Sequence, residues 1–126
     1  MQLCLDTSVI IDWLRRSDSK NTIFHQLLLD QHELIVPVVV VAELFSGKSV
    51  WQYEGAKARL EGMLAECRVL PLESETAVLA GKLRVKHKIA LLDALIAASA
   101  VHHHLELVTL NVKDFLKISD LSLWSK

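Results

Sequence analysis

One carboxylate stands in the middle of an apolar run near the start of the chain, and this feature constrains the fold more than any other. Residues 3–11 read Leu-Cys-Leu-Asp-Thr-Ser-Val-Ile-Ile, with Asp6 as the charged residue. Burying an isolated carboxylate as an ion is costly, so Asp6 must be solvated or compensated. We interpret residues 2–5 as a buried strand, followed by a sharp turn at Asp6 and a helix capped by Thr7 or Ser8. Asp6 is then expected at the carboxyl end of the strand, where open α/β sheets carry their chemistry.

Short strands alternate with helices along the rest of the chain. Further strands are predicted at residues 34–36, 69–70 and 107–109, and a short final strand at 121–124 is an open alternative. Residues 38–41 fit a strand, because they are β-branched, or a helix start, because they follow Pro37. Helices are predicted at residues 9–16, 23–28, 42–46, 53–66, 74–88, 91–101 and 111–116. This alternation predicts a parallel sheet with helices on both faces.

Composition and charge narrow the class of protein. The 126 residues suffice for one domain, 1–126, and 52% hydrophobic with 23% charged residues indicates an ordered globular chain. The formal net charge of −1 means that any nucleic-acid binding must depend on a local basic patch. No apolar run approaches the roughly 18 residues of a membrane span, and no signal peptide is recognisable. Cys4 and Cys67 lie in apolar surroundings, so we expect buried thiols in a cytoplasmic protein.

Three acids lie within apolar runs that contain no flanking Lys or Arg. They are Asp6, Glu43 in Val-Val-Ala-Glu-Leu-Phe, and Asp93 in Ala-Leu-Leu-Asp-Ala-Leu-Ile. Acids are rarely buried without a partner, and clustered carboxylates repel one another and raise at least one pKa. A cation is the natural missing partner, and oxygen ligands favour Mg²⁺ or Mn²⁺ over zinc. The competing interpretation is that each acid merely caps a helix or points to solvent.

A further acidic position is expected after the fourth strand. Asn111 lies nearest to the end of this strand, and Asp114 follows one helical turn later, so either side chain is a candidate to face the cluster. An Asn residue can ligate through its carbonyl oxygen but adds no charge. Hydrogen bonds from Thr7, Ser8 and Thr109 are expected to orient the acids.

Four segments, in order, resemble the PIN-domain family, and their spacing is similar to that of VapC-type toxins of bacterial and archaeal toxin–antitoxin pairs. The likeness covers nearly the whole chain and rests on Asp6-Thr7-Ser8, Val41-Ala42-Glu43-Leu44, residues 92–98, and Thr109-Leu110-Asn111 with Asp114-Phe115. The resemblance implies a PIN-like three-layer α/β/α domain with a short-stranded, mainly parallel sheet of four to five strands. It also implies a magnesium-dependent endoribonuclease, a homodimer and a small VapB-like antitoxin partner.

In proteins of this family, the acids that match Asp6, Glu43 and Asp93 form the metal-binding centre. This chain departs from the pattern at Asn111, where a fourth acid often stands, so Asp114 is the alternative residue to complete the site. We expect Asp6 and Asp93 to bind the metal directly. Glu43 is expected to hold a second metal or a water of the first.

Candidate RNA contacts are basic or aromatic. The basic ones are Arg15, Arg16, Lys48 and the run Lys82, Arg84, Lys86, His87 and Lys88. The tryptophans at positions 13, 51 and 124 could stack on bases, but packing in the core or at an interface is the alternative explanation. His102, His103 and His104 cannot converge on one metal while the helix continues, so they are interpreted as a solvated helix end.

Other families that place an Asp after a first strand fit less well. Haloacid-dehalogenase-like phosphatases need a second Asp two residues later, where this chain has Ser8. Response-regulator receivers need paired acids at the first strand and a later Lys. The alternative from another functional class is a non-catalytic PIN-like protein that binds RNA or regulates a partner, which a neutral Asn111 would allow.

Overall fold

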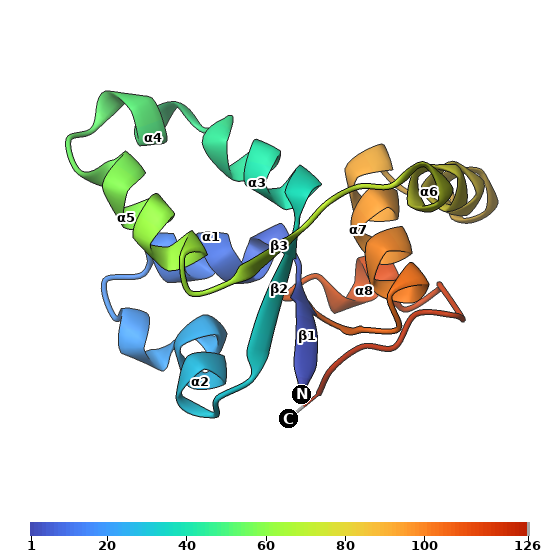
Figure 1. The fold of residues 1–126 in the computed structure, drawn as a ribbon, viewed down its shortest axis with the longest axis horizontal. Coiled ribbons are helices and arrows are strands. Elements are labelled where there is room, and N and C mark those ends of the chain that lie inside the picture. Colours follow the sequence, from blue (N-terminus) through green and yellow to red (C-terminus); the bar gives the residue numbers. More distant parts are fainter. Residues whose placement is uncertain (126) are drawn as a thin grey trace.

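Four short parallel strands form the centre of the molecule in the computed structural model, which describes residues 1–125 (Figure 1). The strands are β1 (Gln2–Leu5), β2 (Glu33–Pro37), β3 (Arg68–Leu70) and β4 (Glu106–Val108), in the order β3-β2-β1-β4. Leu3 pairs with Leu34 on one side and with Glu106 on the other. The alternative fifth strand at 121–124 is reduced to one isolated bridge between Leu107 and Leu123.

Helices cover both faces of the sheet, which confirms the three-layer α/β/α prediction. In Figure 1, the helices before β3 lie to one side of the strands and those after β3 lie to the other side. The first group is α1 (Thr7–Arg15), the 3₁₀ turn η1 (Ser19–Asn21), α2 (Ile23–Leu29), α3 (Val38–Phe45), α4 (Lys48–Gln52) and α5 (Ala56–Leu64). The second group is α6 (Ser74–His87), α7 (Leu91–His102) and α8 (Val112–Phe115).

The strand order explains this division of the helices. The chain moves outward from β1 to β2 and β3, and then crosses back to place β4 on the other side of β1. Right-handed crossovers put the helices of the two directions on opposite faces. The direction reverses between β1 and β4, and open α/β sheets bind their ligands at the carboxyl ends of the strands at such a reversal.

The helix predicted between α3 and β3 has the wrong extent. The helix predicted over residues 53–66 is α5 alone, and a separate short helix, α4, precedes it. The break falls at Gly55, whose φ of 81° is a left-handed conformation that favours glycine. Gly47 directly follows Ser46, the C-cap of α3, as predicted for the end of that helix, and it is also the N-cap of α4.

Residues 38–41 are helical, which resolves an ambiguity that the sequence left open. Pro37 ends β2 and immediately precedes α3, which suits its fixed φ. Val40 and Leu44 are spaced by four residues and are both buried in the core. Packing of this helical face therefore overrides the preference of β-branched residues for strands.

The core fills the space on both sides of the sheet. The strands contribute residues with essentially no exposed surface, such as Leu3, Leu5 and Ile35. Helix α7 is buried along most of its length, as its apolar sequence predicts, and its alanines let α6 pack closely against it. No helix within residues 1–125 is long and apolar enough to span a bilayer.

Candidate functional site

Asp6 lies at the carboxyl end of β1 and is almost completely buried, with 3% of its surface exposed. Its backbone N–H donates to the carbonyl of Val108 over 3.0 Å, which joins the ends of β1 and β4. Its Oδ2 accepts hydrogen bonds from the hydroxyls of Ser8 and Thr109, both at 2.7 Å. Both bonds go to the same oxygen, so Oδ1 is the oxygen left for a ligand.

Ser8 and Thr109 make the predicted hydrogen bonds to Asp6, whereas Thr7, predicted to do the same, makes none. The helix begins with Asp6 as its N-cap, without a capping side-chain hydrogen bond, so the prediction of a Thr7 or Ser8 cap is wrong. The Ser8 hydroxyl instead accepts the backbone N–H of Leu110 at 3.0 Å, and Thr109 Oγ1 accepts that of Asn111 at 2.9 Å. These bonds tie the loop after β4 to the start of α1.

Asp6, Glu43 and Asp93 line one open pocket of about 550 Å³, together with Asn111 and Arg15. We call this hollow the acidic pocket. Glu43 comes from the second half of α3, and Asp93 from the first turn of α7. Three segments far apart in the sequence therefore bring their acids to the same edge of the sheet, as the strand pattern predicts.

Asn111 and Asp114 occupy different sides of Asp93. Asn111 lines the acidic pocket, whereas Asp114 lines an adjoining pocket that also contains Asp93, Lys88 and Lys117. Asn111 is the N-cap residue of α8, and Asp114 lies in its first turn. Of the two candidates, Asn111 is thus the one that faces Asp6 across the pocket.

The acids influence one another electrostatically. The pKa of Asp93 is raised, first by burial and then by the negative charges of Asp6, Asp114 and Glu43, in that order. Asp93 therefore has all three other acids close enough to disfavour its ionised form. A bound cation would relieve this repulsion.

The donors in the acidic pocket fit Mg²⁺ in their chemistry. All are oxygen atoms, and Mg²⁺ is commonly held by one or two carboxylates while it retains several waters. Thr7 Oγ1 is buried without a hydrogen-bond partner in the described part of the chain, so a polar ligand in this pocket would satisfy it. Within residues 1–125, no three His, Cys, Asp or Glu side chains form a ready-made metal site. The fit is therefore to a hydrated ion rather than to a closed protein cage.

Comparison with known proteins identifies the family. The PIN domain family model matches residues 3–121. The chain belongs to the PIN domain family. A search of curated protein sequences gave no significant match.

Solved structures agree with this assignment. The PIN domain superposes on a chain of VapBC-1 from nontypeable Haemophilus influenzae with a TM-score of 0.81 and 26% identity, covering 99% of this chain and 98% of that one. FitAcB from Neisseria gonorrhoeae superposes with a TM-score of 0.76 and 26% identity, covering 99% of this chain and 97% of that one. VapBC2 from Rickettsia felis, bound to a promoter DNA fragment, superposes with a TM-score of 0.80 and 24% identity, covering 99% of this chain and 100% of that one. The resemblance to VapC-type PIN domains is confirmed.

Some predicted basic contacts lie at the site of this PIN domain and others do not. Arg15 lines the acidic pocket, while Arg16 forms a 3.9 Å ion pair with Asp12. From the basic run on α6 and just after it, Lys88 reaches the adjoining pocket. Lys48 and Lys86 are exposed on α4 and α6 and line none of the pockets described above.

The histidines are more ordered than a solvated helix end would be. His102 Nε2 lies 3.6 Å from Glu75 Oε2, and His103 Nε2 lies 3.6 Å from Glu73 Oε1. His102 Nδ1 also contacts the hydroxyl of Thr76, so both rings link α7 to the start of α6. Their role is to join two helices, away from the acidic pocket.

Two residues of the site were missed from the sequence. Asp12 lines the acidic pocket, but Arg15 and Arg16 flank its apolar run, so the criterion that selected the other acids excluded it. Lys117 lines the adjoining pocket together with Asp114, and it follows Asp114 by three positions in the chain. A basic residue one helical turn after a candidate ligand is a pattern that could have identified it.

Proposed function

We propose that this PIN domain is a Mg²⁺-dependent endoribonuclease and the toxin component of a toxin–antitoxin pair. The observation that carries the proposal is the convergence of Asp6, Glu43 and Asp93 on one open pocket at the carboxyl edge of a parallel sheet. The Haemophilus and Rickettsia structures that the fold resembles are VapBC complexes, which supports the assignment to the toxin side of such a pair.

Each residue of the acidic pocket would have its own role in phosphodiester hydrolysis. Bound Mg²⁺, or Mn²⁺, would supply positive charge at the phosphate and make a nearby water more acidic. Asp6 and Asp93 would hold the ion, and Ser8 and Thr109 would keep Asp6 in place through their 2.7 Å hydrogen bonds. Glu43 would accept a hydrogen bond from the attacking water or help to hold a second ion. Asn111 would add a neutral oxygen ligand.

RNA would approach through the basic residues at the margins of the acidic pocket. Arg15 stands on its α1 side, and Lys88 and Lys117 stand beyond Asp93 and Asp114. These three cations flank the acids on two sides, so a phosphate backbone that crosses the pocket would meet positive charge before and after it. The near-neutral net charge of the chain is compatible with this local arrangement.

A second hollow supports an antitoxin partner. A mainly apolar groove of about 220 Å³ is formed by α1, α3, α4 and α5 and includes Leu14, Val50 and Leu60. Arg15 and Glu43 line both this groove and the acidic pocket. An antitoxin helix in the groove would therefore lie next to the acids, where a basic side chain could reach them.

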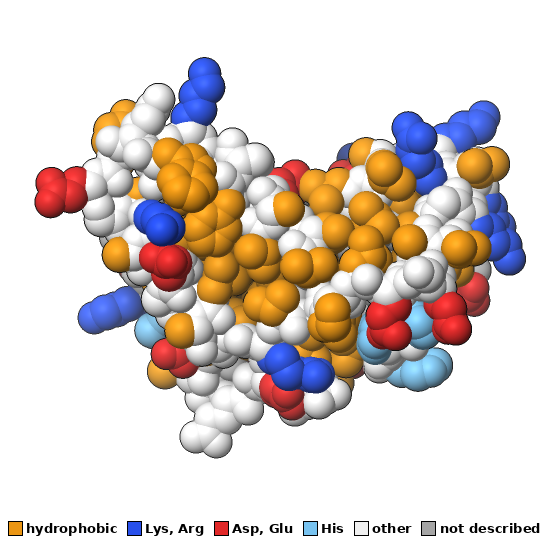
Figure 2. All heavy atoms as spheres, turned by 45° about the horizontal axis from the view of Figure 1, so that its top comes forward, with side chains coloured by type: hydrophobic (Ala, Val, Ile, Leu, Met, Phe, Trp, Pro, Cys, Tyr) orange, Lys and Arg blue, Asp and Glu red, His pale blue; other side chains and the backbone are white. Residues whose placement is uncertain are grey.

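An exposed apolar face supports a homodimer. Figure 2 shows orange side chains spread across the centre of the face at the carboxyl edge of the sheet. Leu91, Leu92 and Leu95 of α7 form a shallow hollow with Val39 of α3, and Leu91 is half exposed. Contiguous apolar surface of this kind marks interaction sites on many proteins.

The neutral residue at position 111 favours one alternative, a PIN domain that binds RNA or regulates a partner without cleaving it. Calorimetry separates the two proposals. Titration of the purified protein with MgCl₂ should give a binding isotherm if the nuclease proposal is correct, and no isotherm if the alternative is correct.

The main test is cleavage of RNA by the purified protein with Mg²⁺ and by three variants, Asp6→Asn, Glu43→Gln and Asp93→Asn. Each is expected to lose at least about 100-fold in rate, because even residues that only orient metal ligands contribute about 10- to 100-fold. Asp120→Asn is the matched control, since Asp120 is exposed and lies outside the acidic pocket. Full activity of Asp6→Asn or Asp93→Asn would refute the assignment.

The toxin role has its own test. Expression of the wild-type chain should arrest growth, and Asp6→Asn should not. Co-expression of a small protein encoded next to this chain's gene should relieve the arrest. Arrest by both forms would contradict toxicity through the acidic pocket, and relief that is unaffected by Val50→Glu in the groove would contradict the proposed antitoxin site.

A further inference from the structure

A pocket beside the acidic one has no part in the function proposed above. It has a volume of about 480 Å³ and lies between the η1–α2 segment and the end of the chain. Asn21 and Gln26 line it from η1 and α2, Trp124 lines it from the C-terminal segment, and Lys20 stands among its lining residues. We call it the Trp124 pocket. Its volume falls within the range of small-molecule sites in proteins, about 300–1,000 Å³.

One hydrogen bond links the lining of the Trp124 pocket to the lining of the acidic pocket. Thr109 lines the Trp124 pocket, and its hydroxyl donates the 2.7 Å hydrogen bond to Asp6 Oδ2. A group bound in the Trp124 pocket would therefore lie one residue away from the carboxylate assigned to the metal. This proximity relates the pocket to the substrate rather than to a remote surface.

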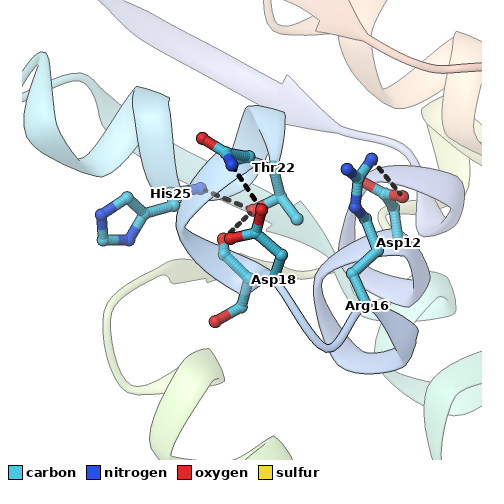
Figure 3. A network of polar contacts seen from close by, with 7 residues as sticks. Asp12, Arg16, Asp18, Thr22 and His25 are labelled. Carbon is cyan, nitrogen blue, oxygen red and sulfur yellow. Dashed lines mark hydrogen bonds and ion pairs between the residues drawn. The ribbon is translucent and has the colours of Figure 1, made fainter.

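The rim of the Trp124 pocket is held in place by local polar contacts (Figure 3). Thr22 Oγ1 donates to the carbonyl of Ser19 at 2.7 Å and accepts the backbone N–H of His25 at 3.3 Å. The Asn21 side-chain amide donates a hydrogen bond to the Asp18 carboxylate. The turn that carries the polar lining residues is therefore formed before any ligand arrives.

The opposite wall is also fixed. The backbone N–H of Trp124 donates to the carbonyl of Leu107 at 2.9 Å, and its indole packs edge-on against His32 with ring centroids 6.4 Å apart. Trp124 is only partly buried, so part of this wall is open to a ligand. A fixed indole can stack on any of the four bases, because each base has a π-face.

The polar lining can read the edge of a base. Gln26 donates its side-chain N–H to Asp30 at 3.2 Å, and Asn21 donates to Asp18. A side-chain amide carries two N–H donors, so each amide keeps one N–H and its carbonyl oxygen for a ligand. The bases present donors and acceptors in different arrangements on their Watson–Crick edges, so these two amides can distinguish one base from another.

We propose that the Trp124 pocket binds one nucleoside of the RNA strand next to the bond that is cleaved, and that it gives the enzyme its base preference. Trp124 stacks on the base, Gln26 and Asn21 hydrogen-bond to its edge, and Lys20 contacts a flanking phosphate. This inference rests on the proposed ribonuclease function, which it deepens by assigning a substrate subsite.

Binding can be tested on the wild-type protein without cleavage. Isotopically labelled protein in EDTA is titrated with AMP, CMP, GMP and UMP, and then with a short single-stranded RNA. The indole N–H signal of Trp124 and the side-chain amide signals of Gln26 and Asn21 should shift, with affinities that differ among the four nucleotides. Trp51 is the internal control because it is 63% exposed on α4 and lies outside the pocket. Shifts confined to other residues would overturn the proposal.

Substitutions then test the contribution to cleavage. Trp124→Leu should reduce kcat/KM by about 5- to 150-fold, the range for loss of one stacked base. Gln26→Ala, which removes an amide from a partly exposed helix position, should reduce the differences in cleavage rate between bases. Trp51→Leu is the matched control and should change neither quantity. Gln26→Ala also keeps the test decisive if the tryptophan substitution lowers the yield of folded protein.

The outcomes separate this inference from the proposed function. If the protein cleaves RNA with Mg²⁺ and neither pocket variant changes its kinetics or base preference, the Trp124 pocket is not a substrate subsite and the nuclease proposal stands. If nucleotides bind at Trp124 but RNA is never cleaved with a divalent metal, the nuclease proposal fails. The nucleoside site then belongs to an RNA-binding protein.

Discussion

The Thr109 hydroxyl donates a 2.7 Å hydrogen bond to Oδ2 of Asp6, although the two residues are 103 positions apart in the chain. The bond joins the carboxyl ends of β1 and β4, where the sheet order reverses. Ser8 donates to the same oxygen, so two hydroxyls hold one side of the carboxylate. The position of Asp6 in the acidic pocket is therefore fixed before a metal binds.

Removing the Thr109 hydroxyl should loosen Asp6. We expect Thr109→Val, which keeps the shape of the side chain, to lower Mg²⁺ affinity or cleavage rate by about 10- to 100-fold, the usual effect of losing a group that orients a ligand. Isothermal titration calorimetry and RNA cleavage measure the two quantities. Thr109→Ser retains the hydroxyl and should stay within a few-fold of wild type. Equal losses in both variants would contradict a role for the hydrogen bond.

The repulsion around Asp93 should appear in the stability of the metal-free protein. Its pKa is raised in the folded state above the ordinary value of 3.8, mainly by burial and then by Asp6, Asp114 and Glu43. The folded state therefore holds the Asp93 proton more tightly than the unfolded state does, and this contribution to stability is lost as pH rises through the folded-state pKa. Asp93→Asn should accordingly raise Tm at pH 7 in EDTA, and the difference should disappear below about pH 3.8.

Mg²⁺ should act in the opposite direction to this repulsion. Adding MgCl₂ at pH 7 should raise the Tm of the wild type because the ion binds the folded state, and the increase should shrink as Asp93 becomes protonated. Thermal unfolding monitored by circular dichroism with and without Mg²⁺ gives both curves. An equal Mg²⁺ effect in wild type and Asp93→Asn would show that the ion does not bind at Asp93.

The location of the site could be predicted from the sequence because it depends on local patterns. Asp6 and Asp93 each lie in an apolar run. Asp6 directly follows a strand and Asp93 lies in the first turn of a helix, and the apolar pattern of the sequence predicts both elements. Parallel strands then bring such positions to one edge. The partner of each side chain could not be predicted, because the Thr109–Asp6 bond and the opposite sides taken by Asn111 and Asp114 depend on how distant segments pack.

Prediction of the fold succeeded to a similar extent and failed for a similar reason. Alternating apolar segments identified every strand of the sheet in the described residues and most of the helices. The β-branched run at 38–41 stayed ambiguous because burial of Val40 against the core, rather than local preference, makes it helical. The start of α4 after Gly47 was missed because glycine also commonly follows the end of a helix.

Asn111 offers a test of which residue completes the acidic pocket. Asn111→Asp places a fourth carboxylate beside Asp6, Glu43 and Asp93, so it should tighten Mg²⁺ binding and lower Tm in EDTA. Asp114→Asn alters the adjoining pocket and should change Mg²⁺ affinity less than Asn111→Ala does. Calorimetry on the three variants gives the order of affinities. A larger loss in Asp114→Asn would make Asp114 the fourth ligand.

The break between α4 and α5 depends on the backbone of Gly55. Its φ of 81° is left-handed, and a Cβ added there would meet no atom within 4 Å, so Gly55→Ala should destabilise the protein by about 1 kcal/mol through backbone strain alone. Gly62 is the matched control, because it is exposed within α5 and its added Cβ is equally free of contacts. Gly62→Ala should stabilise the protein by about 0.5–1 kcal/mol, since alanine favours the helix interior. Urea unfolding measures both changes. A stabilising effect of Gly55→Ala would mean that Gly55 does not hold the left-handed conformation that separates α4 from α5.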